Sequence, residues 1–218
     1  MSRQSVLAGL AACLACCVAA AGCTNNPYPD TDRDQKVHYS SFNEAPKTLD
    51  PAVAYTTAEH VITGNVYDTL LEYHYVDRPY RLIPGLAETV PEPEQRPDGR
   101  QAYRFRIRPA VFFHDDPCFA LDAAGRTTRE VGAADVAFAL ARVADPAVNS
   151  PVISSFAQVE GFAEFGKRLV ELRKSERGFA GLPEHEQYKR AGGIACVAVR
   201  GERELEVILA EPNVQILY

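Results

Sequence analysis

The chain has 218 residues, of which 46% are hydrophobic and 24% charged, and its formal net charge is −6. This length is enough for one large domain or two small ones, each with a buried core. The acidic balance excludes the basic footprint of a nucleic-acid-binding domain, so we expect no nucleic-acid partner.

The N-terminus has the pattern of an export signal. Arg3 gives a positive start, residues 6–21 are uncharged and mostly apolar, and small residues precede Cys23. The apolar run is too short to cross a bilayer with ease, which favours a cleaved signal peptide over residues 1–22. The protein is therefore expected to be exported, to the periplasm or another extracytoplasmic compartment.

Cys23 sharpens this prediction. Small residues and Gly22 before a cysteine resemble the bacterial lipobox, in which the cysteine is acylated and becomes the mature N-terminus. The sequence LAAC, ending at Cys13, fits the same pattern but leaves an apolar run of only about seven residues, so Cys23 is preferred. A plain secretory signal with chance cysteines is the alternative. With Cys23 acylated, the membrane would hold the protein through a lipid anchor.

Two thiols remain beyond the signal and Cys23, at Cys118 and Cys196. An exported protein can join such residues in a disulfide, and two independent thiols are the alternative. Residues 23–35 are polar and contain two prolines, which is typical of a flexible tether.

The remaining pattern alternates strands and helices. Residues 36–42 are expected to form a strand, and the proline-containing segment after them to be extended. Thr57 is expected to cap a helix over 58–71, in which Val61, Ile62, Val66, Leu70 and Leu71 form an apolar stripe. Later elements are strands within 80–108, including one at 103–108, a helix at 133–144, partly helical structure over 155–191 with a break at 178–183, and a hairpin with strands at 194–199 and 204–209. The fold class predicted is mixed α/β or α+β.

The stretch FFHDDPCF at 112–119 contains residue types that bind metals. His114, Asp115 and Asp116 are consecutive, and neighbouring strand side chains point to opposite faces, so a strand could not aim all three at one ion. A strand end followed by an Asp-Asp-Pro turn explains the stretch without a ligand. We therefore predict no metal and no cofactor, with a secreted metal-dependent hydrolase that uses these three residues as an alternative.

Six landmarks occur in order along residues 37–218. They are TLDPA at 48–52, NVYDTLLEY at 65–73, LIPGLAET at 82–89, DGRQAYRFRIRPAVFFHD at 98–115, AADVAFALARVADP at 133–146 and ELEVILAEPNVQILY at 204–218. The ordered set is more specific than any single short motif. On these residues the chain resembles the large solute-binding proteins of ABC importers that handle peptides, nickel and related solutes.

The resemblance implies a periplasmic-binding-protein-like, two-lobed clamp that binds without turnover, so the protein is not expected to be an enzyme. It implies that residues 36–68 begin the first lobe, 69–165 form an accessory domain, and 166–218 return to the first lobe. Family members are much longer, so the chain is expected to be an N-terminal portion that binds ligand weakly or not at all by itself. The expected molecule is a monomer.

The resemblance also implies a site and partners. The segment after LDP follows the cleft floor in the family, which makes Tyr55, Thr56 and Thr57 the main candidates, with Asn43 and Glu44 secondary. An oligopeptide is the expected ligand, and an ABC permease with its ATPase the expected partner. Helix capping and loop packing explain the same residues without a ligand. A structural lipoprotein without transport function is a further alternative.

Overall fold

The computed structural model describes residues 27–218, which fall into two units. The first unit ends at Phe42 and the second spans Asn43–Tyr218. The predicted signal peptide and Cys23 lie outside the described residues. No helix among the described residues is long and apolar enough to cross a membrane.

In the first unit, residues 27–42 contain one short 3-10 helix, η1 (Asp30–Asp32). The ring of Tyr28 stacks on that of Tyr39, with centroids 3.6 Å apart. The predicted strand over 36–42 is wrong for this structure, because these residues take part in no strand pairing. A strand is stabilised by hydrogen bonds to a neighbour, so composition alone does not produce one.

The second unit contains helices, short strands and 3-10 turns in mixed order. The helices are α2 (Thr57–Val66), α3 (Ala133–Ala144), α4 (Phe162–Ser175) and α5 (Glu184–Arg190). The strands are β1 (Leu71–Tyr73), β2 (Leu82–Pro84), β3 (Glu94–Gln95), β4 (Gln101–Arg106), β5 (Val197–Val199) and β6 (Glu204–Leu209). The 3-10 helices are η2 (Ile153–Phe156), η3 (Phe179–Gly181) and η4 (Val214–Leu217). This mixture confirms the predicted fold class.

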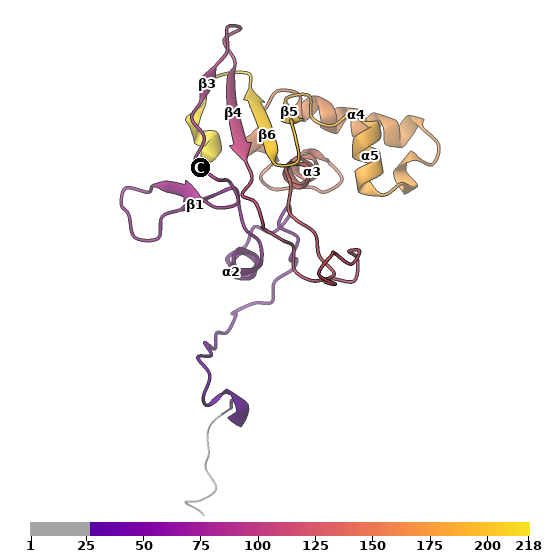
Figure 1. The fold of residues 1–218 in the computed structure, drawn as a ribbon. Coiled ribbons are helices and arrows are strands. Elements are labelled where there is room, and N and C mark those ends of the chain that lie inside the picture. The colour runs from indigo at the N-terminus through magenta and orange to yellow at the C-terminus, as the bar shows by residue number, and fades with distance from the viewer. Residues whose placement is uncertain (1–26) are drawn as a thin grey trace, which may run out of the picture. The chain divides into compact units, whose positions relative to one another are not determined.

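An antiparallel sheet in the order β3-β4-β6-β5 forms the centre of the unit (Figure 1). In its register, Tyr103 lies opposite Val207 and Phe105 opposite Leu205. The side chains of all four residues are buried, whereas Arg104, which lies between Tyr103 and Phe105 in β4, is exposed. The predicted alternation along 103–108 is therefore confirmed. β1 and β2 form a separate hairpin.

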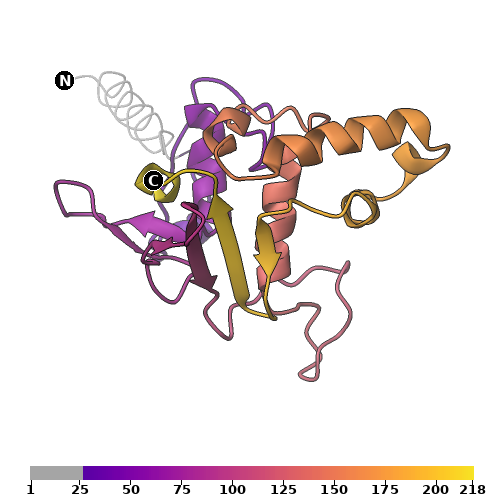
Figure 2. The same ribbon diagram turned by 90° about the horizontal axis from the view of Figure 1, so that it is seen from above.

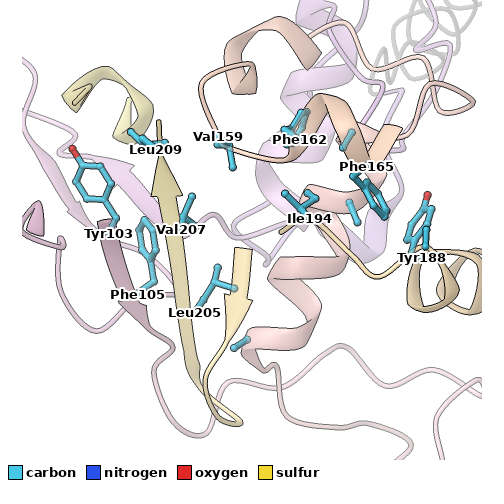
Figure 3. Close-up of a cluster of buried hydrophobic side chains, with 14 of the residues drawn as sticks. Tyr103, Phe105, Val159, Phe162, Phe165, Tyr188, Ile194, Leu205, Val207 and Leu209 are labelled. Atoms are coloured by element: carbon cyan, nitrogen blue, oxygen red, sulfur yellow. The ribbon is translucent and has the colours of Figure 1, made fainter. Parts of the chain in front are cut away.

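Helices α3, α4 and α5 lie on the side of the sheet next to β5 (Figures 1 and 2). They supply the rest of the main core. Figure 3 shows Phe162 and Phe165 of α4 with Tyr188 of α5 and Ile194 in the same cluster as the sheet residues Leu205 and Val207. The helix predicted at 133–144 is confirmed to the residue. The break predicted at 178–183 is also confirmed, since it contains η3 between α4 and α5.

The helix predicted over 58–71 and the first strand of the predicted hairpin need correction. The helix predicted over 58–71 ends at Val66, and its N-cap is Thr56 instead of Thr57. Its buried residues are Glu59 and Thr63, so the predicted apolar stripe is not the buried face. The first hairpin strand is also shorter than predicted, because β5 begins only at Val197.

The predicted division into lobe and accessory domain stays a prediction. β4, from the segment assigned to the accessory domain, pairs along its whole length with β6, from the segment assigned to the returning lobe. The two segments therefore share one sheet, and both belong to the single unit Asn43–Tyr218.

Candidate functional site

The loop before α2 is organised around one buried carboxylate. Glu59, whose exposed fraction is 3%, accepts backbone hydrogen bonds from Lys47 at 3.1 Å and from Tyr55 and Thr56 at 2.9 Å each. The donors lie at both ends of the segment 47–56. Glu59 therefore closes this segment into a loop and fixes the backbone beside Tyr55.

The sequence Thr56-x-x-Glu59 explains why the helix begins here. The Thr56 hydroxyl accepts from the Glu59 N–H at 3.3 Å, while the Glu59 carboxylate accepts from the Thr56 N–H. This reciprocal capping box satisfies two N–H groups that a helix start leaves unpaired. The backbone hydrogen bonds from Thr56 and Tyr55 lower the pKa of Glu59 from 4.5 to about 2.

A second anchor holds the middle of the loop. Asp50 of the LDP sequence accepts hydrogen bonds of 2.8 and 2.7 Å from the two terminal nitrogens of Arg142, on α3. The hydrogen-bonded guanidinium lowers the pKa of Asp50, and the carboxylate raises that of Arg142. Arg142 also contacts Glu184 of α5 at 3.1 Å. The loop is thus tied to α3, and the same arginine links α3 to α5.

The five predicted site residues have different positions on this frame. Tyr55 is 73% exposed, so its ring and hydroxyl face solvent although its backbone is fixed. The Thr56 hydroxyl is engaged as the cap, while Thr57 begins the helix and is exposed. Asn43 and Glu44 are exposed at the start of the unit. Within residues 27–218, no hydrogen bond joins these two to the Tyr55–Thr57 junction.

The arrangement is suited to holding a polar chain. It presents an aromatic face and hydroxyl groups on a backbone that two carboxylates fix in place, and such groups can pack against and hydrogen-bond an extended ligand. The sequence prediction missed Glu59, Asp50 and Arg142 as positioning residues. The T-x-x-E pattern was the signal that could have identified Glu59.

The FFHDDPCF stretch is a turn in an irregular two-stranded arm. Phe112 bridges to Glu130, and the Asp116 N–H donates to Thr127 O at 2.8 Å. The Asp116 carboxylate accepts from the Cys118 N–H at 2.8 Å, as an Asx turn requires. Among residues 27–218, no group of three or more His, Cys, Asp or Glu side chains is placed to hold a metal ion. The turn interpretation is therefore the one that the contacts support.

The two remaining cysteines occupy different surroundings. Cys118 is exposed and Cys196 is buried, and both thiols are free, so the disulfide considered from the sequence is not present in this structure. The side chain of Asp116 raises the pKa of Cys118, whereas burial raises that of Cys196. Neither thiol therefore has the lowered pKa that makes a cysteine reactive.

A separate groove of about 740 Å³ runs along α4. Its walls are mainly apolar, including Ile153 and Phe162, with Lys167 and Lys174 beside them. None of the five predicted site residues lines it. We place the candidate site at the Tyr55 loop, because that loop contains the residues that the resemblance implies and its backbone is fixed by Glu59 and Asp50.

The fold resembles those of solved peptide-binding proteins. The oligopeptide ABC transporter of Bacillus anthracis (substrate-binding domain) matches with a TM-score of 0.53 and 21% identity over 82% of this chain. The pheromone receptor PrgZ, described with its mode of peptide binding, matches with a TM-score of 0.52 and 22% identity over 79%. The murein tripeptide binding protein MppA of Escherichia coli matches with a TM-score of 0.51 and 17% identity over 81%.

These similarities show the fold and its extent. The chain spans 27% of the length of each of these three structures, so it corresponds to part of their fold. No protein-family model matches the sequence, and a search of curated proteins gives no match. The chain therefore has the mixed α/β fold of a portion of such a two-lobed binding protein.

Proposed function

We propose that the chain provides part of the first lobe of a solute-binding protein of an ABC importer, with an oligopeptide as the solute. The observation that carries the proposal is the fold, which over about four fifths of the chain matches proteins described as peptide-binding. In this role the protein binds its ligand without turnover and passes it to a permease and its ATPase. The expected monomer fits this role.

The geometry of the Tyr55 loop supports a role in binding. Tyr55 is exposed while the backbone around it is fixed by Glu59 and, through Asp50, by Arg142. A fixed backbone reduces the entropy lost when a ligand binds. An extended peptide can be held largely through its main chain. We assign the ligand contacts to the side chains of Tyr55 and Thr57, with Asn43 and Glu44 flanking them. Thr56 positions these residues, because its hydroxyl and N–H are already bonded to Glu59.

A two-lobed binding protein closes both lobes on its ligand. The chain spans about a quarter of the matched structures, so we expect the part of the site present here to bind peptides only weakly. A peptide at ten times its Kd stabilises the native state by about 1.4 kcal/mol. The test is a thermal unfolding series of the chain with a pool of tri- to pentapeptides up to 10 mM, which keeps even millimolar affinity measurable.

The expected result is a concentration-dependent rise in Tm with peptides and no rise with a matched pool of free amino acids or of oligosaccharides. Equal stabilisation by oligosaccharides, or none by peptides at the highest concentration, would reject the peptide assignment.

We further propose that Cys23 carries the lipid that anchors the protein to the membrane after export. The sequence of residues 1–23 supports this. The test is metabolic labelling with a fatty-acid analogue in a bacterial host. Cys23→Ser should abolish the label and leave the signal peptide uncleaved, whereas Cys13→Ser should still be labelled and cleaved. Loss of the label in Cys13→Ser instead would place the anchor at Cys13. No label in the unchanged protein would indicate a plain secretory signal.

A further inference from the structure

A hollow of about 430 Å³ lies at the sheet, away from the Tyr55 loop. Its charged lining is four arginines and two glutamates. These are Arg96, Arg104, Arg106, Arg200, Glu204 and Glu206, with Phe105 and Leu205 completing the wall. The lining therefore carries two net positive charges, in a chain whose formal charge is −6.

Strand register brings these residues together. In the antiparallel pair β4–β6, Arg104 lies opposite Glu206 and Arg106 opposite Glu204. Their neighbours along each strand, such as Phe105 and Leu205, belong to the main core. Because side chains alternate between the two faces of a strand, the charged residues occupy the face opposite that core.

Three of the guanidinium groups converge on one buried carboxylate. Glu206 is 2% exposed and accepts from Arg96 at 2.8 Å and from Arg104 at 3.3 Å on one oxygen, and from Arg200 at 2.7 Å on the other. A single carboxylate offsets the charge of one guanidinium. Glu206 therefore positions three cations while leaving their combined charge in excess.

Two further carboxylates lie at the edge of this cluster. Glu94 contacts Arg104 at 3.2 Å, and Glu88 contacts Arg106 at 3.5 Å. Both are partly exposed, with side-chain exposed fractions of 48% and 35%, so solvent weakens their attraction for the arginines.

Arg96 and Arg200 have hydrogen-bonding capacity to spare and, in the described part of the chain, are not paired with a carboxylate at the edge of the cluster. Within residues 27–218, the side chain of each makes one hydrogen bond, to Glu206, and no ion pair with any other residue. Each guanidinium has five N–H donors in a planar fork. Their remaining donors are available to a ligand with several acceptor oxygens.

We propose that this hollow is a binding site for a small oxyanion, such as a phosphate group. Arg96 and Arg200 donate to the anion oxygens, Arg104 adds charge, and Glu206 holds the three in place from beneath. Guanidinium groups bind phosphate and carboxylate through paired, charge-assisted hydrogen bonds, which fits both the residue type and the charge of the lining. The proposal does not depend on the peptide site.

The same chemistry could be met by a free phosphate or by the headgroup of an anionic lipid. The test therefore has two arms on the 218-residue chain. One arm is calorimetric titration with inorganic phosphate at low ionic strength, with acetate for comparison. The other is sedimentation with vesicles of phosphatidylglycerol, compared with phosphatidylcholine.

Arg200→Gln is the principal variant, because Arg200 is 57% exposed and outside the core. Arg81→Gln is the matched control, since Arg81 is similarly exposed at 55% and, among residues 27–218, forms an ion pair only with Asp77 of the β1–β2 hairpin. Loss of one charge-assisted hydrogen bond should weaken phosphate binding about tenfold. Thermal unfolding of each variant checks that the fold is kept, and Arg96→Gln serves as a second variant if Arg200→Gln unfolds.

We expect the protein to bind phosphate. Arg200→Gln should weaken this binding, and Arg81→Gln should leave it unchanged. Vesicle binding with the same dependence on Arg200 would identify the lipid headgroup as the source of the anion. Absence of binding in both arms, or equal loss with both variants, would overturn the site, since equal loss indicates general charge attraction.

Discussion

Arg142 and Asp50 form a two-hydrogen-bond ion pair, at 2.8 and 2.7 Å, that joins the LDP sequence to α3. The two residues are 92 positions apart and belong to two of the landmarks recognised in the sequence. Their contact gives those landmarks a physical reason to occur together, because each supplies half of the anchor that holds the Tyr55 loop.

Breaking this pair should destabilise the protein measurably. Asp50→Asn removes the charge that Arg142 contacts, and we expect a loss of about 1.5 kcal/mol in the free energy of unfolding. Urea denaturation followed by circular dichroism measures it. Asp77→Asn is the control, because Asp77 forms an exposed pair with Arg81 and such pairs contribute about 0–1 kcal/mol. Equal losses in the two variants would show that Asp50 is no anchor.

The N-cap of α2 can be assigned by two adjacent substitutions. Thr56→Ala removes the hydroxyl that accepts from Glu59 N–H and should cost about 1 kcal/mol. Thr57→Ala, one residue further, removes an exposed hydroxyl and should change stability by less than about 0.5 kcal/mol. The opposite order, measured by urea denaturation, would restore Thr57 as the cap.

Glu59 should give the stability of the protein a distinct acid dependence. Its pKa is about 2 in the folded state against an ordinary 4.5, so the unfolded state binds more protons between these values. The contribution of the Glu59 carboxylate to the free energy of unfolding is therefore fully present above about pH 5 and is lost as the pH falls toward 2. Glu59→Gln should flatten this part of the stability–pH curve measured by thermal unfolding. An unchanged curve would contradict the hydrogen bonds assigned to Glu59.

Asp145 should be the most sensitive carboxylate of the core. It is 1% exposed and accepts from Arg173 at 2.5 and 2.6 Å and from the Tyr188 hydroxyl at 3.0 Å. Asp145→Ala leaves Arg173 without its carboxylate partner and should cost about 3 kcal/mol by urea denaturation. Glu176→Ala, which breaks an exposed pair with Arg190, should cost at most about 1 kcal/mol.

Secondary structure could be predicted best from the sequence where the local hydrophobic pattern coincides with burial in the core. The alternation at Tyr103 and Phe105 and the apolar periodicity of α3 each identified an element that the core then stabilises. The strand predicted at 36–42 did not form, because no partner strand pairs with it among the described residues. The prediction for α2 was wrong about its buried face, whose side chains are Glu59 and Thr63. Apolar periodicity does not predict a polar buried face.

The candidate site shows the same division. Tyr55 was proposed as a site residue from the nearby LDP sequence, and that assignment stays a prediction. Arg142 could not be identified from the sequence, since its contact with Asp50 depends on tertiary structure that brings α3 to the loop. The arginines around Glu206 were also missed, because their convergence depends on the register of β4 and β6 and on the positions of the adjoining turns.

Peptide binding at the Tyr55 loop is tested most directly by amide NMR during titration with the tri- to pentapeptide pool. We predict shift changes concentrated at residues 43–57, which Tyr55→Ala abolishes and Tyr75→Ala leaves intact. Tyr75 is the matched control, because it is a tyrosine exposed to 92% on the β1–β2 hairpin. Shift changes confined to other parts of the chain, or equal loss in the two variants, would contradict peptide binding at this loop.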